Sequence, residues 1–190
     1  MVKVELGDIA TWVAGVGTVA AFFLAFGQLE AERRRKTKEE HEGQARSISA
    51  WVAREGVGTA QGDDGPVTWI AISNSSNKPI HEVVATIVKF PHGGGRDSLN
   101  DGKNVPLEFR AFVSVVPPGI SYARVSGGYR GMHFQPAVEV AFKDRSGGYW
   151  IRGKNGGTFE IEKDPVIHYG FSHPMGWSLP LTKIPESSIR

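Results

Sequence analysis

The sequence predicts a mainly β protein in which one long apolar helix precedes an antiparallel β-sandwich. Three observations support this fold class. The stretch Ile9–Leu29 contains no charged residue, residues 48–162 hold short runs of β-branched and aromatic residues separated by Gly, Pro, Asn and Asp, and no helical periodicity interrupts those runs. Short strands at this spacing favour two packed sheets over a small β-barrel, the alternative that the same pattern allows.

The uncharged stretch predicts a transmembrane helix over residues 9–29, preceded by a non-cytoplasmic segment over residues 1–8. About 20 helical residues at about 1.5 Å each cover the roughly 30 Å hydrocarbon core of a bilayer. A cleaved signal peptide and a buried helix of a soluble protein are the alternatives. The residues of the expected anchor are an interfacial tryptophan, two phenylalanines and a stripe of small residues that permits a homodimer through the helix: Trp12, Phe22, Phe23, Gly17, Ala21 and Ala25.

A basic cluster follows the apolar stretch and predicts its orientation. Five basic residues lie within positions 33–38, whereas Lys3 is the one basic side chain before the stretch. Because basic residues near a span stay on the cytoplasmic side, we expect the C-terminal part of the chain in the cytoplasm. The cluster can also contact anionic lipid headgroups, or form only a solvated, charged helical stalk over residues 30–46 that Gly43 weakens or ends. Its members are Arg33, Arg34, Arg35, Lys36 and Lys38.

Seven or eight strands are expected in the sandwich domain, which we place at residues 47–164, and eight segments are candidates. In the clearest one, Ala137–Lys143, Val138, Val140 and Phe142 alternate with less apolar residues, the pattern of a half-buried strand. The other seven are Ile48–Arg54, Val67–Ser73, Ile80–Phe90, Glu108–Val116, Ser121–Ser126, Tyr149–Arg152 and Thr158–Glu162.

Several short segments resemble one loosely defined group of proteins. These segments are Gly7–Trp12 before the apolar helix, the arginine-rich stalk, Ile72–Ile80 around a polar Asn-Ser-Ser-Asn turn, and Val115–Gly119 with its Pro-Pro-Gly turn. Together they resemble uncharacterised bacterial single-span membrane proteins that carry a C-terminal immunoglobulin-like sandwich. The resemblance implies that fold, but it implies no activity and no functional residue.

Motifs for catalysis, metals and cofactors are missing from the sequence. It contains no cysteine, its six histidines lack the spacing of metal ligands, and no nucleophile elbow or complete phosphate-binding loop is present. Basic and acidic residues after position 47 are nearly balanced and scattered, which disfavours nucleic-acid binding. We therefore expect no enzyme, no cofactor and no metal.

The C-terminal tail, residues 165–190, combines four prolines with aromatic residues. Tyr169, Phe171 and Trp177 are candidate partner-binding residues in a docking peptide, or else they pack as a strap on their own domain. The leading hypothesis is a membrane-anchored, non-enzymatic adaptor or scaffold whose cytoplasmic sandwich binds an unknown protein. The alternative has reversed topology: an extracytoplasmic domain that binds a ligand or carbohydrate through aromatic residues such as Trp69 and Trp150.

Overall fold

The computed structural model describes residues 6–57, 66–91, 95–127 and 134–184. The chain divides into two compact units, Met1–Glu40 and His41–Arg190. The first unit consists of most of helix α1 (Leu6–Arg46), and the last turn of that helix belongs to the second unit. Residues 58–65 and 92–94 lie outside the described part of the chain.

Helix α1 is one unbroken helix from Leu6 to Arg46. The expectation that the helix ends or weakens at Gly43 is wrong, because the sandwich holds the turn that follows it. The side-chain amide of Gln44 donates to the Lys78 and Pro79 carbonyls, each at 3.3 Å, and Ala45 is buried. The amide of Ser47 then donates to the Gln44 carbonyl at 3.0 Å and ends the helix.

The predicted span falls within α1. Among the residues that the structure describes, no helix combines the length and the apolar character that a membrane crossing requires.

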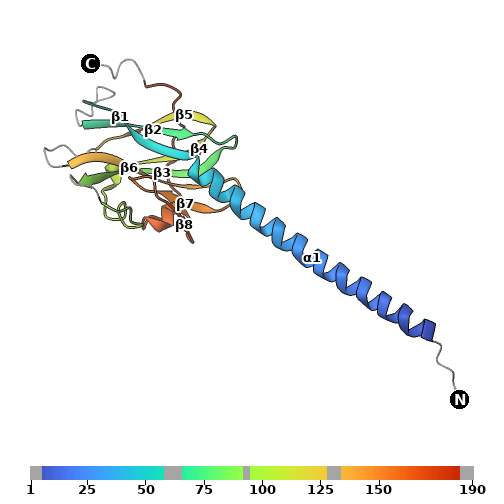
Figure 1. Ribbon diagram of the computed structural model, residues 1–190. Coiled ribbons are helices and arrows are strands. Elements are labelled where there is room, and N and C mark those ends of the chain that lie inside the picture. Colours follow the sequence, from blue (N-terminus) through green and yellow to red (C-terminus); the bar gives the residue numbers. More distant parts are fainter. Residues whose placement is uncertain (1–5, 58–65, 92–94, 128–133, 185–190) are drawn as a thin grey trace. The chain divides into compact units, whose positions relative to one another are not determined.

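The second unit is a sandwich of two antiparallel sheets, as predicted. One sheet has the order β1-β2-β5 and the other β4-β3-β6-β7-β8 (Figure 1). All eight expected strands are present, most of them lengthened by one to three residues. They are β1 (Ile48–Val57), β2 (Pro66–Asn74), β3 (Ile80–Pro91), β4 (Arg110–Val116), β5 (Gly119–Val125), β6 (Phe134–Lys143), β7 (Tyr149–Arg152) and β8 (Thr158–Ile161). A short 3-10 turn, Leu107–Phe109, precedes β4, and the short helix α2 (Pro165–His168) follows β8.

The main core lies between the two sheets and is built from alternate residues of each strand. Ile70 and Ile72 of β2 and Ala123 of β5 face Val140 and Phe142 of β6, and all five are buried. Removing this much apolar surface from water is the dominant stabilising contribution for a domain of this size.

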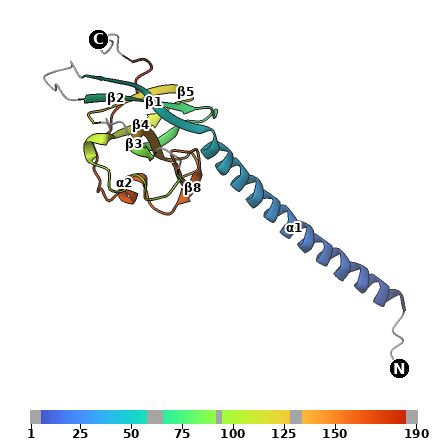
Figure 2. The ribbon, with the colours of Figure 1, turned by 60° about the vertical axis from the view of Figure 1, so that its left-hand side comes forward.

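A second, smaller core covers the outer face of the five-stranded sheet. Val84, Phe112 and Ile151 of that face are buried against Val166 of α2 and Tyr169, which follows it. α2 and β8 lie together on this side of the sandwich (Figure 2). The expectation that β6 is only half-buried is therefore wrong: its second face is buried because the C-terminal segment packs over it.

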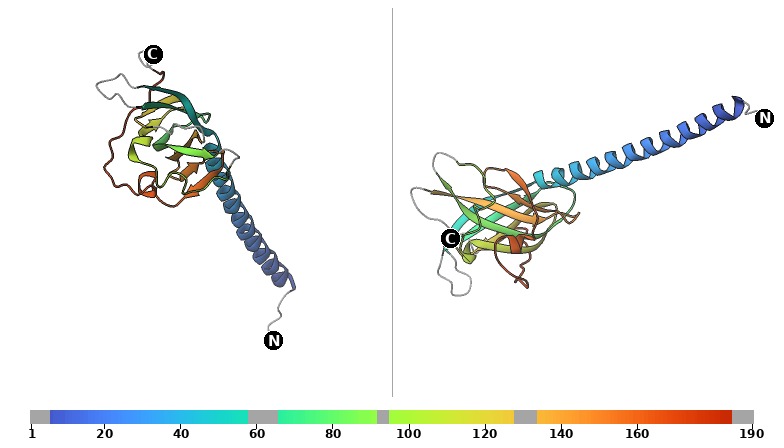
Figure 3. Two further views of the ribbon diagram at one scale, coloured as in Figure 1. Left: turned by 90° about the vertical axis from the view of Figure 1, so that its left-hand side faces the viewer. Right: turned by 90° about the horizontal axis from the view of Figure 1, so that it is seen from below.

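The segment after α2 continues along the outside of the sandwich to the other sheet (Figure 3). The Ser178 amide donates to the Phe112 carbonyl of β4 at 2.8 Å, and the Leu181 amide donates to the Tyr122 carbonyl of β5 at 2.9 Å. β4 and β5 end their respective sheets, so one segment covers both neighbouring edges. We call residues 171–184 the strap.

Candidate functional site

A buried polar cluster lies between the outer face of the five-stranded sheet and the C-terminal segment. Its centre is Arg110 of β4, whose guanidinium donates to the Thr86 hydroxyl at 2.9 Å and to the Val105 carbonyl at 3.1 Å. It also donates to the Gly102 carbonyl. The guanidinium carbon lies 4.4 Å from the centre of the Tyr169 ring and 5.2 Å from that of Phe171. Arg110 thus joins the sheet, the loop before β4 and the C-terminal segment.

Glu139 of β6 completes this cluster and is fully buried. Its Oε1 accepts a hydrogen bond from the Tyr169 hydroxyl at 2.6 Å, whereas its Oε2 has no hydrogen-bond partner among the described residues. Burial raises the pKa of the Glu139 carboxyl from 4.5 to about 7, because the lowering effects of Tyr169 and Arg110 offset only part of the lost hydration. Burial also raises the pKa of Tyr169 well above its usual value.

The loop before β4 is fixed at two points to the turn between β7 and β8. The Asp97 carboxylate accepts from the Asn155 amide at 2.8 Å and from the Gly157 amide at 2.7 Å, which fastens the loop to the turn between β7 and β8. Nearby, Lys154 Nζ lies 2.9 Å from Asp101 Oδ2 and is well buried. Side chains at Gly153 or Gly157 would collide with Asp97, so these two glycines permit the close contact.

A pair of carboxyl groups, Glu82 and Asp164, lies at the start of α2. Burial and the hydrogen bond to Asp164 raise the pKa of Glu82. Burial acts to raise the pKa of Asp164 as well, but hydrogen bonds from Glu82, from the Val166 amide and from His173 hold it below its ordinary value. Glu82, the one described non-glycine residue with positive φ, lies at the register shift between β3 and β6. Since Asp164 is the N-cap of α2, this pair fixes the start of the helix.

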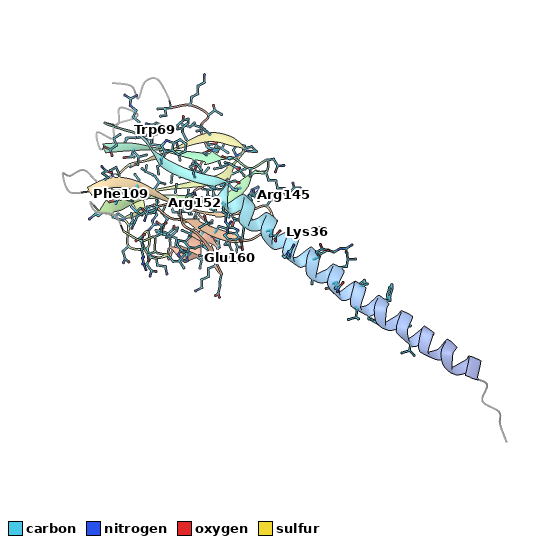
Figure 4. All side chains as sticks on the ribbon, viewed as in Figure 1. Lys36, Trp69, Phe109, Arg145, Arg152 and Glu160 are labelled. Atoms are coloured by element: carbon cyan, nitrogen blue, oxygen red, sulfur yellow. The ribbon has the colours of Figure 1, made fainter. Side chains whose placement is uncertain are left out.

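A groove of about 400 Å³ opens beside the end of β8. Leu99 and Ile167, both with exposed side chains, flank it, and the buried Ile161 contributes to its wall. Charged residues of both signs complete the lining: Lys103, Glu160, Glu162, Lys163 and His168. Figure 4 places Glu160 on β8 and Trp69 in the other sheet.

His168 links the groove to the buried cluster, since the Tyr169 side chain next to it reaches Glu139. Its Nε2 lies 3.1 Å from the Leu99 carbonyl. Burial lowers the pKa of His168, and the charges of Lys103 and Lys163 lower it further, while the Leu99 carbonyl opposes them. The lowered pKa favours the neutral imidazole, and protonation of His168 on acidification adds positive charge to the groove.

The two sites differ in what they can do. Arg110, Glu139 and Tyr169 are too deeply buried to contact a dissolved substrate, so the cluster fixes the C-terminal segment. The groove is open, apolar at its flanks and adjacent to β8, which ends its sheet. Such an edge binds an extended peptide through main-chain hydrogen bonds, with pockets for alternate side chains. Among the described residues, no three metal-ligating side chains come together.

The predicted site residues fall into two groups. The anchor and basic residues all belong to α1. The side chains of Trp12, Gly17, Ala21, Arg34 and Lys38 lie outside the described part of the structure. The side chains of Phe22, Phe23, Ala25, Arg33, Arg35 and Lys36 are exposed.

The aromatic residues proposed for binding pack on their own domain. Tyr169 is buried, and Phe171 and Trp177 are half-buried, with ring centres 5.8 Å and 6.3 Å from that of Phe112. This is the strap arrangement considered from the sequence. Trp69 and Trp150, proposed for carbohydrate binding, are both buried, and the Trp150 indole donates to Asp144 at 2.9 Å.

Sequence reasoning missed Arg110, Glu139 and the groove. Glu139 alternates with Val138 and Val140 as an outward residue of an amphipathic strand does, so no pattern marked its burial.

Comparison with family models, curated proteins and solved structures finds no match to this chain.

Proposed function

We propose that the chain is a membrane-anchored, non-enzymatic module whose cytoplasmic sandwich binds a protein partner. The observation that carries the proposal is a series of exposed large apolar side chains on α1. At Phe22, Phe23 and Leu24 the exposed fractions are 68%, 69% and 70%. Exposed side chains continue on both sides of this triplet at Val16, Val19, Phe26 and Leu29.

These side chains favour a bilayer over a single protein partner. Neighbouring helical residues point about 100° apart, so three consecutive apolar residues face most of the circumference of the helix. Burying each one is worth roughly 1.5–3 kcal/mol, on the order of 10 kcal/mol for the whole series. One partner surface covers one face of a helix, whereas lipid surrounds it.

The basic residues after the apolar stretch support a cytoplasmic sandwich. Arg33, Arg35 and Lys36 are exposed on α1 and lie within two turns of Leu29. Basic residues this close to a span are retained on the cytoplasmic side. Anchoring then confines the sandwich to a thin layer beside the membrane and raises its effective concentration toward partners there.

The groove beside β8 is the proposed partner site. An extended segment of the partner protein adds to the edge of β8, and its apolar side chain enters between Leu99 and Ile167. The mixed charges of Glu160 and Lys163 at the rim select the partner's flanking residues.

The strand order supports an immunoglobulin-like arrangement, which we also propose. In that class, strands A, B and E share one sheet while C, F and G share the other. Here β1, β2 and β5 would correspond to the first set and β3, β6 and β7 to the second. β4 and β8 would be the strands added beside C and G.

Single-cysteine labelling tests the anchor and its orientation, because the natural chain has no cysteine. In the full chain, Ser146→Cys on the exposed turn between β6 and β7 should react with a membrane-impermeant maleimide only after cell lysis. Lys3→Cys should react in intact spheroplasts. Labelling of Ser146→Cys in intact spheroplasts would contradict the cytoplasmic placement and indicate the reversed topology.

Charge substitution tests the apolar series itself. Phe23→Asp combined with Leu24→Asp should move the chain from the membrane fraction to the aqueous fraction after carbonate washing. Leu107→Asp, at an exposed position of the sandwich, is the matched control and should remain with the membrane. A natural chain that is released by carbonate contradicts the anchor.

Site-specific crosslinking tests the partner groove. A photoreactive residue at Leu99 should give a discrete protein adduct in native membranes, and Ile167→Asp should abolish it. The same residue at Arg145, outside the groove, should give none. If the Leu99 position yields no adduct, or if its adduct survives Ile167→Asp, the groove is not the binding site.

A further inference from the structure

The outer face of the three-stranded sheet carries an ordered arrangement of apolar and basic residues. Because Ile70, Ile72 and Ala123 point into the core, the residues that alternate with them point outward. Cross-strand register then places Trp51 of β1 beside Ala71 of β2, and Ala71 beside Tyr122 of β5. Leu181 of the strap pairs with Tyr122 and extends this row beyond the sheet.

The neighbouring rows have different chemistry. On one side, Ile120 lies opposite Ser73, near the turn that joins β4 and β5. On the other side, Arg54 and Arg124 lie opposite Trp69 from its two flanking strands. Trp69 and Ala71 are buried, so the open part of the face consists of Trp51, Ile120 and the strap residue Leu181, bordered by the two arginines.

Three large apolar side chains on this face are in contact with water. The exposed fractions are 43% for Trp51, 51% for Ile120 and 41% for Leu181. We call these three residues, with Tyr122, Arg54 and Arg124, the aromatic–arginine face. Large exposed apolar side chains gathered on one face of a folded domain indicate an interaction surface.

The charged residues of the aromatic–arginine face indicate which class of ligand it binds. Among the described residues, no Asp or Glu stands in its outward rows, and the strap over residues 171–184 contains none either. Glu55, the acid next to Arg54, is in register with Thr68 and Val125, in the row that alternates with the outward one. The face therefore presents exposed apolar groups and positive charge, and the exposed acid beside Arg54, Glu55, stands outside its outward rows.

We propose that the aromatic–arginine face docks on the surface of an anionic bilayer. Trp51, Tyr122 and Ile120 lie at headgroup depth, where amphipathic rings are favoured, while Arg54 and Arg124 contact lipid phosphates. Tryptophan, aliphatic residues and arginine without acids are the composition of interfacial membrane contacts. The docking rests on the proposed anchor, which holds the domain beside the membrane, but it concerns a different surface.

The test uses the full chain in lipid nanodiscs with a single environment-sensitive fluorophore. Ile120→Cys places the fluorophore on the face, and Arg145→Cys is the matched control at an exposed position on the turn between β6 and β7. The discs contain about 30% phosphatidylglycerol. In them, the fluorescence emission of the label at position 120 should shift to the blue and be quenched by nitroxide-labelled lipid. The label at position 145 should do neither.

Replacing the two arginines should weaken docking to anionic lipid, as high salt does. Arg54→Gln with Arg124→Gln removes two basic contacts of about 1 kcal/mol each, which corresponds to about a 30-fold lower ratio of docked to undocked chain. Discs of phosphatidylcholine alone, or high salt, should have a similar effect. Circular dichroism establishes that each labelled variant is folded.

The outcomes separate the docking from the anchor. Docking is overturned if labels at positions 120 and 145 give equal spectra and equal quenching in anionic discs. If the chain does not enter discs at all, the anchor fails, and the same label is then read with preformed anionic vesicles. A blue shift there supports the face without the anchor, and its absence overturns the face as well.

Discussion

Glu139 is a buried ionisable residue beneath the C-terminal segment, so it links the stability of the domain to pH. Its carboxyl is fully buried, hydrogen-bonded to Tyr169 at 2.6 Å and close to Arg110. An acid whose pKa is raised in the folded state prefers to remain protonated there. The stability that it allows is fully present below its unfolded pKa of 4.5 and is lost as the pH rises toward the folded pKa of about 7.

Glu139→Gln should remove this pH dependence. Glutamine keeps an oxygen to accept the Tyr169 hydroxyl but cannot ionise. The natural chain should lose up to about 3 kcal/mol of unfolding free energy between pH 4.5 and pH 7.5, since each pKa unit corresponds to about 1.4 kcal/mol. The variant should lose much less, as measured by urea unfolding at several pH values. Glu160→Gln, on the exposed part of β8, should leave the pH profile unchanged.

Turn residues were the most predictable individual residues. Asp is favoured in turns because its carboxylate caps nearby amides, and Asp144 and Asp164 both do so: Asp144 accepts from the Ser146 and Gly148 amides, and Asp164 from the Val166 amide. These contacts are local in sequence, so residue type and spacing suffice to predict them. Arg110 binds Thr86 from 24 positions away, and no local pattern announces such a contact.

The strap is the element whose removal should have the most specific effect. The Ser178 amide donates to the Phe112 carbonyl, and the Ser178 carbonyl accepts from the Ser114 amide at 3.1 Å. These two hydrogen bonds hold the strap on β4. Ser178→Pro removes the donor. We expect faster amide hydrogen exchange at Ser114 and Leu181, measured by mass spectrometry, with β2 and β6 unaffected. Leu179→Ala, at a highly exposed strap position, should leave exchange unchanged.

The strands were predictable as elements, whereas the covering of the sheet was not. Alternation and turn residues define each strand locally, and all eight were placed from them. Whether the outer face of β6 is exposed to water depends on where the segment around Tyr169 packs, 30 positions after Glu139. Tyr169 and Trp177 could equally have served an external partner, because aromatic residues in an irregular segment do not specify which surface they cover.

At the scale of the whole chain, the two compact units should be separable. Trypsin should cut the exposed basic cluster at Arg33, Arg35 or Lys36 and leave a fragment that retains the sandwich. Because Gln44 and Ala45 remain in that fragment, its free energy of unfolding in urea should match that of the full chain within about 0.5 kcal/mol. A fragment that loses its β signal in circular dichroism contradicts two independent units.

Gln44→Ala is the companion variant for this experiment. It deletes the buried amide that donates to Lys78 and Pro79, so the fragment should lose about 1–2 kcal/mol of unfolding free energy. Loss of stability in this variant but not on cleavage would place the boundary of the sandwich between the basic cluster and Gln44.

Covering two strand edges with one segment has a consequence for a crowded population of molecules. β4 and β5 each end a sheet, and bare edges of this kind recruit strands from neighbouring copies. Copies confined to a plane would meet far more often than copies in free solution. By covering the edges of β4 and β5, residues 171–184 would keep these two edges from templating neighbouring copies, and would thus protect solubility as well as the fold.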